Sequence, residues 1–402
     1  MKVAFNTYLI KIINWICPNI KLSSLFKSML HSIWMIVFSL LWLEHVNTFD
    51  GFEFMSNIND YKEWLGSKIT RHETNELSNE KYLFINTSKN NFLLPVDNDN
   101  LLNTVITDRV VLAKVLNILD SNALKIKYII CDIFFYDYDL NNDSILQSVI
   151  NRLDKKGKII IPYYISNNRV VDPIISSNMG LSQYDYSFLK EQYLKFNYIT
   201  QDTLKKLPLL VYEKIANKTM EVHNKFGLKY YTLDKTWCLN TIIPEFRIKS
   251  ENLISDLTYY DMGIFSSELI TMDQIVFIGD FEGIYDNHIT ITNRVPGPLI
   301  LINALESLFN GDNIVRFSYL IYLFLFFLII SYNALFKPKE NSNLLPRKEV
   351  IYTWLTKNIT YILIFILTIS SMYLFHHYIN LMILLTYFIV IDFVKSLVLN
   401  LK

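Results

Sequence analysis

Two aspartates and a histidine crowd into one turn in the last third of the chain. The segment FIGDFEGIYDNHIT, residues 277–290, ends an apolar run at Gly279 and then supplies Asp280, Asp286 and His288. Carboxylates and an imidazole at this spacing could bind a hard cation or transfer protons. They could also cap the turn, through side-chain hydrogen bonds to their own backbone.

A third aspartate, Asp132, lies inside a second apolar run, KYIICDIFF, residues 127–135. Asp132 and Asp280 both fall near the carboxyl end of an expected parallel strand, and that edge of an open α/β sheet is where ligands bind. A ligand site built from Asp132, Asp280, Asp286 and His288 is therefore a coherent hypothesis, although we favour the capping of turns and helices as their role. A calcium loop would need more oxygen ligands at closer spacing, so the metal, if any, stays unknown.

Asn303 interrupts an otherwise apolar helical pattern, LILINALESLF, residues 299–309. It is either a buried polar latch, which we favour, or a tentative further ligand contact. Catalysis is the least favoured reading of the whole set. The chain shows no nucleophile elbow, phosphate-binding glycine loop, zinc-ligand spacing or Ser/His/Asp order. We assign no catalytic residue and no cofactor, and expect a protein that is not an enzyme.

Apolar runs of strand length alternate with helical patterns upstream of this turn. Continuously apolar strands joined by helices predict a mostly parallel sheet covered on both faces by helices. The expected strands are residues 81–88, 127–135, 158–166 and 273–280, with short ones in YYTLDKTWCLN and FRIKS. The expected helices are residues 107–122, 142–153, 207–227 and 299–309.

The composition is too apolar for an ordinary soluble domain. Hydrophobic residues make up 51% of 402 residues, and the mean hydropathy is +0.22. This favours membrane spans in addition to a folded domain. Lys plus Arg equal Asp plus Glu at 38 each, so charge gives no argument for a nucleic-acid partner.

Four stretches have the length and apolarity of transmembrane helices: residues 28–46, 315–336, 359–375 and 379–398. The first could be mistaken for a signal peptide, but no small-x-small cleavage site follows it. Lysines and arginines concentrate in residues 1–27, in the loop 337–358 and at the chain end. The positive-inside rule therefore places both termini and this loop in the cytoplasm, and residues 47–314 outside. No heptad or small-xxx-small seam stands out in these spans.

The three cysteines show neither a disulfide framework nor a zinc spacing. Cys17 precedes the first span. Cys131 and Cys238 could form one bridge, or both could be buried thiols, which is the simpler interpretation.

Several short motifs in a fixed order resemble the extracytoplasmic sensory domains called CHASE, type two. These domains precede bacterial adenylate cyclases, histidine kinases and serine/threonine kinases. The motifs are DRVVLAKVLNIL (108–119), IICDIFF (129–135), the acidic Asp143, IVFIGD (275–280), Asp286-x-His288-x-Thr290, and Pro296-Gly297 before Asn303-Ala304-Leu305. The resemblance covers roughly residues 47–314 and includes the layout of one span before and three after. In this chain, however, Ile291 and Leu301 replace the family's usual proline and histidine, so a ligand contact made by that histidine would be absent.

The resemblance implies a bacterial membrane sensor whose outer domain recognises a small molecule or an envelope signal. No kinase or cyclase sequence follows the last span, so we expect a separate cytoplasmic signalling partner, and the family's habit implies a homodimer. Two other functions stay open: a membrane-anchored scaffold for an envelope protein, and an extracytoplasmic enzyme.

Overall fold

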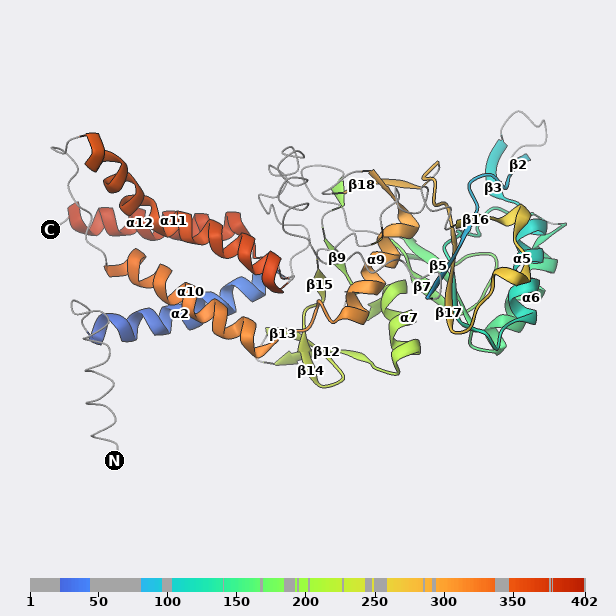
Figure 1. The fold of residues 1–402 in the computed structure, drawn as a ribbon, viewed down its shortest axis with the longest axis horizontal. Coiled ribbons are helices and arrows are strands. Elements are labelled where there is room, and N and C mark those ends of the chain that lie inside the picture. Colours follow the sequence, from blue (N-terminus) through green and yellow to red (C-terminus); the bar gives the residue numbers. More distant parts are fainter. Residues whose placement is uncertain are drawn as a thin grey trace. The chain divides into compact units, whose positions relative to one another are not determined.

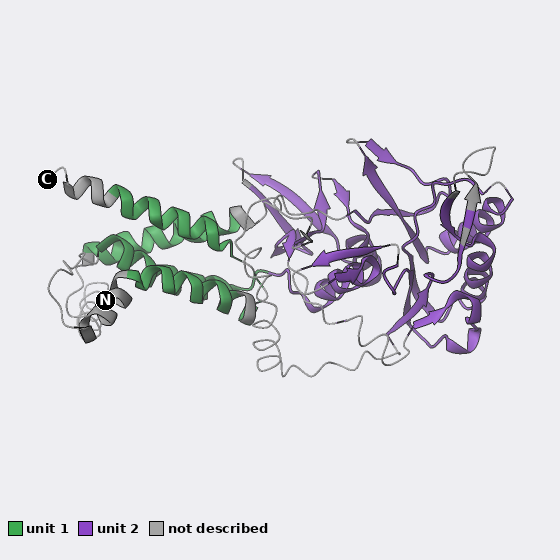
Figure 2. Cartoon of the chain, turned by 90° about the horizontal axis from the view of Figure 1, so that it is seen from above, with its two compact units in different colours: residues 1–45, 315–402 green, residues 46–314 purple. Residues whose placement is uncertain are grey.

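The computed structural model divides the chain into two compact units, residues 1–45 with 315–402, and residues 46–314 (Figure 2). The residues that the structure describes are 22–43, 81–95, 103–139, 141–166, 169–183, 192–193, 195–201, 203–225, 228–242, 248, 259–284, 286–290, 294–336, 347–375, 377 and 379–400. The N-terminal segment 1–21, the first part of the loop 337–358, the expected strand FRIKS apart from Ile248, and Cys17 lie outside them.

A seven-stranded mixed sheet forms the centre of the unit 46–314. Its strands run in the order β16-β1-β17-β4-β5-β6, and β7 pairs with β5. Every pairing is parallel except that of β5 with β6. The bounds are β16 Tyr259–Asp261, β1 Tyr82–Asn86, β17 Gln274–Gly279, β4 Ile126–Cys131, β5 Ile159–Ser166, β6 Arg169–Val171 and β7 Met179–Leu181.

Helices cover both faces of this sheet (Figure 1). Alternate residues of the central strands point into two separate cores, as the two-residue period of a strand requires. One core packs under α5 (Arg109–Ser121) and α6 (Asp143–Lys155). The other packs under α7 (Leu207–Ala216) and α9 (Gly297–Asn310). Double coverage explains why β1 and β17 are buried along their whole length.

Short strands and single-turn helices complete the unit. They are β2 (Asn91–Pro95) with β3 (Asn103–Thr107), β9 (Phe196–Asn197) with β15 (Thr241–Ile242), β10 (Ile199–Thr200) with β11 (Leu204–Lys205), the sheet of β12 (Met220–Lys225), β13 (Leu228–Leu233) and β14 (Thr236–Cys238), and the sheet of β19 (Arg294–Pro296), β18 (Asn287–Thr290) and β8 (Gln192–Tyr193). The 3-10 helices η1 (Met262–Ile264) and η2 (Ser267–Leu269) lie between β16 and β17.

One expected helix is wrong in its second half. The pattern predicted a helix over 207–227, but α7 ends at Ala216 and β12 begins at Met220. Asn217 has a left-handed backbone (φ 52°) and stops the helix, and residues 220–225 then pair with β13 along their full length. The apolar stretch 207–216 alone produced the helical pattern.

The cysteines lie on opposite faces of the sheet. Cys131 belongs to the core under α5 and α6, whereas Cys238 belongs to the core under α7 and α9. Both thiols are buried, and the disulfide between them that the sequence left open is not formed.

Four long helices make up the described part of the other unit: α2 (Leu22–Leu43), α10 (Phe317–Phe336), α11 (Arg347–Phe375) and α12 (Leu381–Asn400). Two of them, over Ser23–Leu41 and Phe317–Phe336, are long and apolar enough to cross a bilayer. The apolar stretches of the other two, Asn358–Ser371 and Leu381–Val394, are shorter. The helices thus give two candidate spans, and the expected four are not confirmed.

The described side chains of this unit are apolar on the outside as well as in much of the interior, unlike those of a soluble bundle. Exposed positions carry large apolar residues, including Leu30, Ile33 and Trp34 on α2. Buried positions carry hydroxyl groups, including Ser28 and Ser32 of the same helix. Such small residues at an i, i+4 spacing let membrane helices approach closely, and this seam escaped the sequence analysis.

Candidate functional site

The candidate site lies where three adjacent parallel strands end. β1, β17 and β4 finish at Asn86, Gly279 and Cys131, so Asn86, Asp280 and Asp132 come to one edge of the sheet. The ladder continues past the strands, because the Asp132 backbone N donates to the carbonyl of Ile278 at 2.8 Å. The sequence expectation that Asp132 and Asp280 share an edge is therefore met by the pairing of β4 with β17.

Asp280 holds the turn that follows β17. Its Oδ1 accepts hydrogen bonds from the hydroxyl of Ser88 and, at 2.9 Å, from the backbone N of Gly283. Its Oδ2 accepts from the backbone N of Asp286 at 3.2 Å. Gly283 has φ +66°, a conformation that glycine adopts without strain. These bonds match the capping alternative for Asp280.

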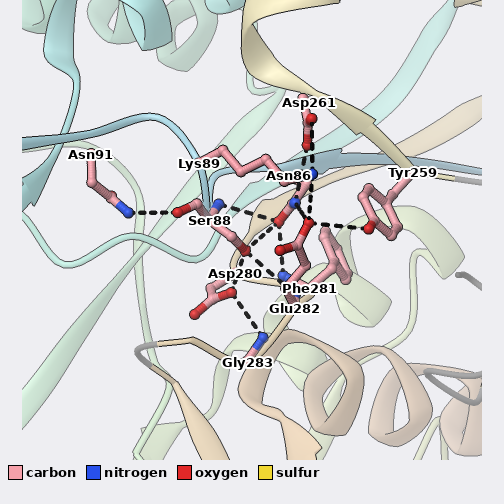
Figure 3. A network of polar contacts seen from close by, with 10 residues as sticks. All are labelled: Asn86, Ser88, Lys89, Asn91, Tyr259, Asp261, Asp280, Phe281, Glu282 and Gly283. Atoms are coloured by element: carbon pink, nitrogen blue, oxygen red, sulfur yellow. Dashed lines mark hydrogen bonds and ion pairs between the residues drawn. The ribbon is translucent and has the colours of Figure 1, made fainter.

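Asn86 organises the neighbouring part of the edge (Figure 3). Its Oδ1 accepts from the hydroxyl and backbone N of Ser88, at 2.6 and 3.2 Å, and from the backbone N of Phe281 at 3.2 Å. Its Nδ2 donates to Asp261 and Glu282 at 3.2 and 3.1 Å. The buried amide thus joins β1, β16 and the turn after β17, and it is a residue that sequence reasoning missed.

Lys89 and Tyr259 bind the acidic groups of this network, one through ion pairs and the other through a hydrogen bond. The Lys89 Nζ lies 3.0 Å from Glu282 and 3.4 Å from Asp261. Hydrogen bonds to Glu282 and then Asp261 raise the pKa of the exposed Lys89 ammonium. The Tyr259 hydroxyl donates to Glu282 at 3.1 Å. Each acid here already has a partner, so the network of Figure 3 is structural.

Asp286 and His288 form a pair beside the first turn of α9. Asp286 Oδ1 and His288 Nε2 lie 2.6 Å apart, with the aspartate side chain 41% and the histidine 14% exposed. The antiparallel pairing of β18 with β19 brings Asp286 opposite Gly297, whose backbone N donates to the Asp286 carbonyl at 3.1 Å. The Asp286-x-His288 turn and the Pro296-Gly297 pair are therefore parts of one hairpin.

Asp132 differs from the other acids of this edge. Its Oδ2 is buried and has no hydrogen-bond partner among the residues that the structure describes. Burial raises the pKa of Asp132 well above its usual range, and the nearby negative charge of Asp286 raises it further. A desolvated carboxylate beside a second carboxylate costs stability, which is the pattern expected of a residue kept for binding.

Asn303 does not join this group. Its Oδ1 accepts from the backbone N of Ile248 at 2.9 Å, and its Nδ2 donates to the carbonyls of Ile248 and Leu299 at 2.9 and 2.8 Å. The amide is fully buried and uses its hydrogen-bonding capacity on protein. The geometry favours the latch over a ligand contact.

Chemically, the site offers a protonatable aspartate, a second aspartate and a histidine. Within the described residues, no group of three or more His, Cys, Asp or Glu side chains is arranged to hold a metal ion. Two of the expected residues, Asp132 and Asp286, act on one another, and His288 joins them through Asp286. Comparisons with protein-family models, with curated proteins and with solved structures find no match to this chain, so geometry alone identifies the site.

Proposed function

We propose that this chain is a membrane-anchored receptor whose α/β unit binds a small molecule at Asp132, Asp286 and His288. The observation that supports it most is the buried, unpartnered Oδ2 of Asp132 beside a second carboxylate. A polar atom left in this state costs about 1–3 kcal/mol, which a ligand donor would recover. The site also lies at the carboxyl edge of parallel strands, the usual ligand position in such sheets.

Along the chain, only a short segment connects the helix beside the site, α9, to the apolar helix α10. α9 begins at Gly297, against Asp286, and ends at Asn310. The following residues are hydrogen-bonded to the end of β14. Leu239 N donates to the Asn313 carbonyl at 2.8 Å, and Cys238 and Ile314 form an isolated antiparallel β-bridge. Only residues 315 and 316 then precede α10. Movement of α9 on ligand binding would therefore act on α10 directly.

The membrane part of the proposal goes beyond two candidate spans. Lipid around a helical bundle favours exposed apolar side chains, and close helix packing favours small buried hydroxyl side chains. The four helices carry side chains of both kinds. We propose four spans, with residues 47–314 outside a bacterial cytoplasmic membrane and both termini in the cytoplasm. Like the CHASE type-two receptors that the sequence resembles, this chain would pass its state to a cytoplasmic partner, here in trans, and act as a homodimer.

A thermal unfolding screen on the full chain in detergent tests the receptor proposal. A panel of small metabolites is added to the wild type, to Asp132→Asn and to Glu268→Gln, a control on the exposed η2. The proposal expects a compound that raises the unfolding temperature of the wild type and the control but not of Asp132→Asn. It also expects slower hydrogen exchange over residues 297–316 with that compound. Stabilisation that is equal in all three proteins would contradict the proposed site.

A scaffold is the second candidate, and one observation favours it. Leu93 and Val105 face one another across the β2–β3 hairpin, and both are exposed. Paired apolar side chains on an exposed hairpin suit a protein partner. Loss of a cross-linked envelope partner in Leu93→Thr with Val105→Thr, together with no ligand in the screen, would favour the scaffold.

A further inference from the structure

A row of aromatic side chains continues from Asp132. After β4, the side chains of residues 132–138 alternate between buried and exposed positions. Ile133 and Phe135 are buried under α5 and α6, whereas Phe134, Tyr136 and Tyr138 are 42%, 46% and 66% exposed. Asp132 has the same parity as the three rings, so its side chain, whose Oδ2 is buried, points away from the core under α5 and α6 on the same side of the segment.

Tyr164 of β5 completes the row. Its ring centroid lies 5.6 Å from that of Phe134, in an edge-to-face contact, and 5.5 Å from that of Tyr136. The Tyr136 hydroxyl donates to the Tyr164 hydroxyl at 3.2 Å. We refer to Phe134, Tyr136, Tyr138 and Tyr164 as the aromatic row.

Buried contacts hold the segment that carries this row. The Phe135 carbonyl accepts from Ile174 N at 2.6 Å. The buried guanidinium of Arg109 lies 4.7 Å from the Phe135 ring centroid, donates to the Asp137 carbonyl at 3.1 Å and lies 3.4 Å from the Asp143 carboxylate. The exposed rings are therefore preorganised, which lowers the entropy cost of binding.

The chemistry of this face selects a cation. Asp132 and Asp286 supply two carboxylates, and Asp286 is the one charged group that acts on Asp132 among the described residues. Aromatic rings present a negative face, so the row attracts positive charge as well. The unpartnered Oδ2 of Asp132 accepts a hydrogen bond, so a cation with N–H donors fits it better than a fully methylated one.

We propose that the ligand carries a primary ammonium or guanidinium group, which Asp132 and Asp286 bind, and an apolar part, which lies on the aromatic row. This inference rests on the proposed ligand site and names the chemical class of its ligand. The ammonium donates to Asp132 Oδ2, and Tyr136 and Phe134 contact the apolar part.

Three related probes separate the parts of the proposal in calorimetric titrations of the full chain in detergent. 2-Phenylethylamine has the charge, the N–H donors and a ring; its N,N,N-trimethyl derivative lacks the donors; 2-phenylethanol lacks the charge. We expect the amine to bind most tightly and the alcohol not to bind. Asp132→Asn should weaken amine binding about tenfold to hundredfold, since a charge-assisted hydrogen bond is lost.

Variants of the row and matched controls complete the test. Tyr136→Leu should weaken amine binding about twofold to fivefold, the effect of losing one exposed ring contact with the apolar part of the ligand. Glu268→Gln and Tyr230→Leu, an exposed acid and an exposed tyrosine elsewhere in the unit, should leave it unchanged. If Asp132→Asn does not fold, Asp286→Asn, on a less buried side chain, gives the same readout.

Equal binding of the amine and its trimethyl derivative would overturn the requirement for N–H donors. Binding of a divalent metal ion alone, lost in Asp132→Asn, would overturn the organic cation. An anionic or neutral metabolite that stabilises the chain through Asp132 would also overturn it, while the proposed binding site would stand. Amine binding that survives both aspartate changes would contradict the inference and the site together.

Discussion

The carboxylate of Asp286 occupies the space where a side chain at position 297 would begin. A Cβ built on Gly297 would lie 2.6 Å from the Asp286 Cγ, well inside any ordinary contact. A side chain at position 297 would therefore have to displace the Asp286 carboxylate, although the backbone of Gly297 is not left-handed. This contact fixes the Asp286–His288 pair against the first turn of α9.

Gly297→Ala should displace Asp286 and disturb its contact with His288. We expect a loss of about 1–3 kcal/mol in the free energy of unfolding, the usual cost of overpacking, together with weaker ligand binding. Gly263→Ala is the matched control, because a Cβ there meets its nearest atom at an ordinary 3.5 Å. Denaturant unfolding of both variants measures the difference, and equal stability would remove the steric argument.

Asp132→Asn should stabilise the protein while it weakens binding. Burial, and then Asp286, raise the pKa of Asp132, so the folded state holds its proton more tightly than the unfolded chain does. The stability that this proton contributes is complete below the ordinary aspartate pKa of about 3.9 and is lost as pH rises through the raised value.

Asparagine imitates the protonated form at every pH. The unfolding temperature of Asp132→Asn should exceed that of the wild type at pH 7 by about 2–4 °C for each kcal/mol gained. The difference should shrink as the pH falls towards 4. A pH-independent difference, or a less stable variant at pH 7, would show that Asp132 is not a strained carboxylate.

Asn303→Ala should destabilise the unit without changing ligand specificity. The substitution leaves the buried N–H and C=O of Ile248 without their Asn303 partners, at a cost of about 2–3 kcal/mol. Asn310→Ala, on the exposed end of the same helix, should cost under about 1 kcal/mol. Thermal unfolding measures both, and a selective loss of ligand binding in Asn303→Ala would restore its role as a ligand contact.

Ser32 and Ile33 should respond in opposite ways to a large side chain. Ser32 is buried within the helical unit and donates to the Ser28 carbonyl at 2.6 Å, whereas Ile33 is exposed. Ser32→Phe should therefore separate α2 from its neighbours and lower the unfolding temperature in detergent, while Ile33→Phe should be tolerated. The reverse result would mean that Ile33 packs against protein rather than lipid.

Accessibility labelling tests the orientation in intact cells, with a cysteine introduced at position 268 or 348 of a chain that carries Cys17→Ser. An impermeant thiol reagent should label Glu268→Cys and leave Lys348→Cys unlabelled until the membrane is permeabilised. Cys131 and Cys238 are buried and should contribute little background. Labelling of both positions from one side would contradict the proposed topology.

The sequence predicted the central strands well, because parallel strands buried on both faces read as unbroken apolar runs, as in β4 and β17. The features that the sequence did not predict depend on contacts with residues far along the chain. Asn86 ends an apolar strand, and only the pairing of β1 with β17 brings it to Glu282. The β12–β13 hairpin likewise overrides a helical pattern that began in α7.

The sequence predicted which edge of the sheet carries Asp132 and Asp280, but not the role of each. Position at strand ends brought Asp132 and Asp280 together correctly. Their hydrogen bonding differs. Both carboxylate oxygens of Asp280 accept hydrogen bonds within the turn, whereas Asp132 Oδ2 has no partner among the described residues. No local pattern distinguishes two aspartates that each follow an apolar strand.

The position of β17 between β1 and β4 has a consequence for biosynthesis. β1 and β4 emerge early but have no pairing with one another, and the strand that joins them is the last of the sheet to leave the ribosome. Until then both carry open backbone edges, which invite aggregation and make such topologies slow to fold. The next long apolar helix, α10, follows within a few dozen residues, so completion of the sheet and delivery of that helix to the bilayer would be nearly simultaneous events.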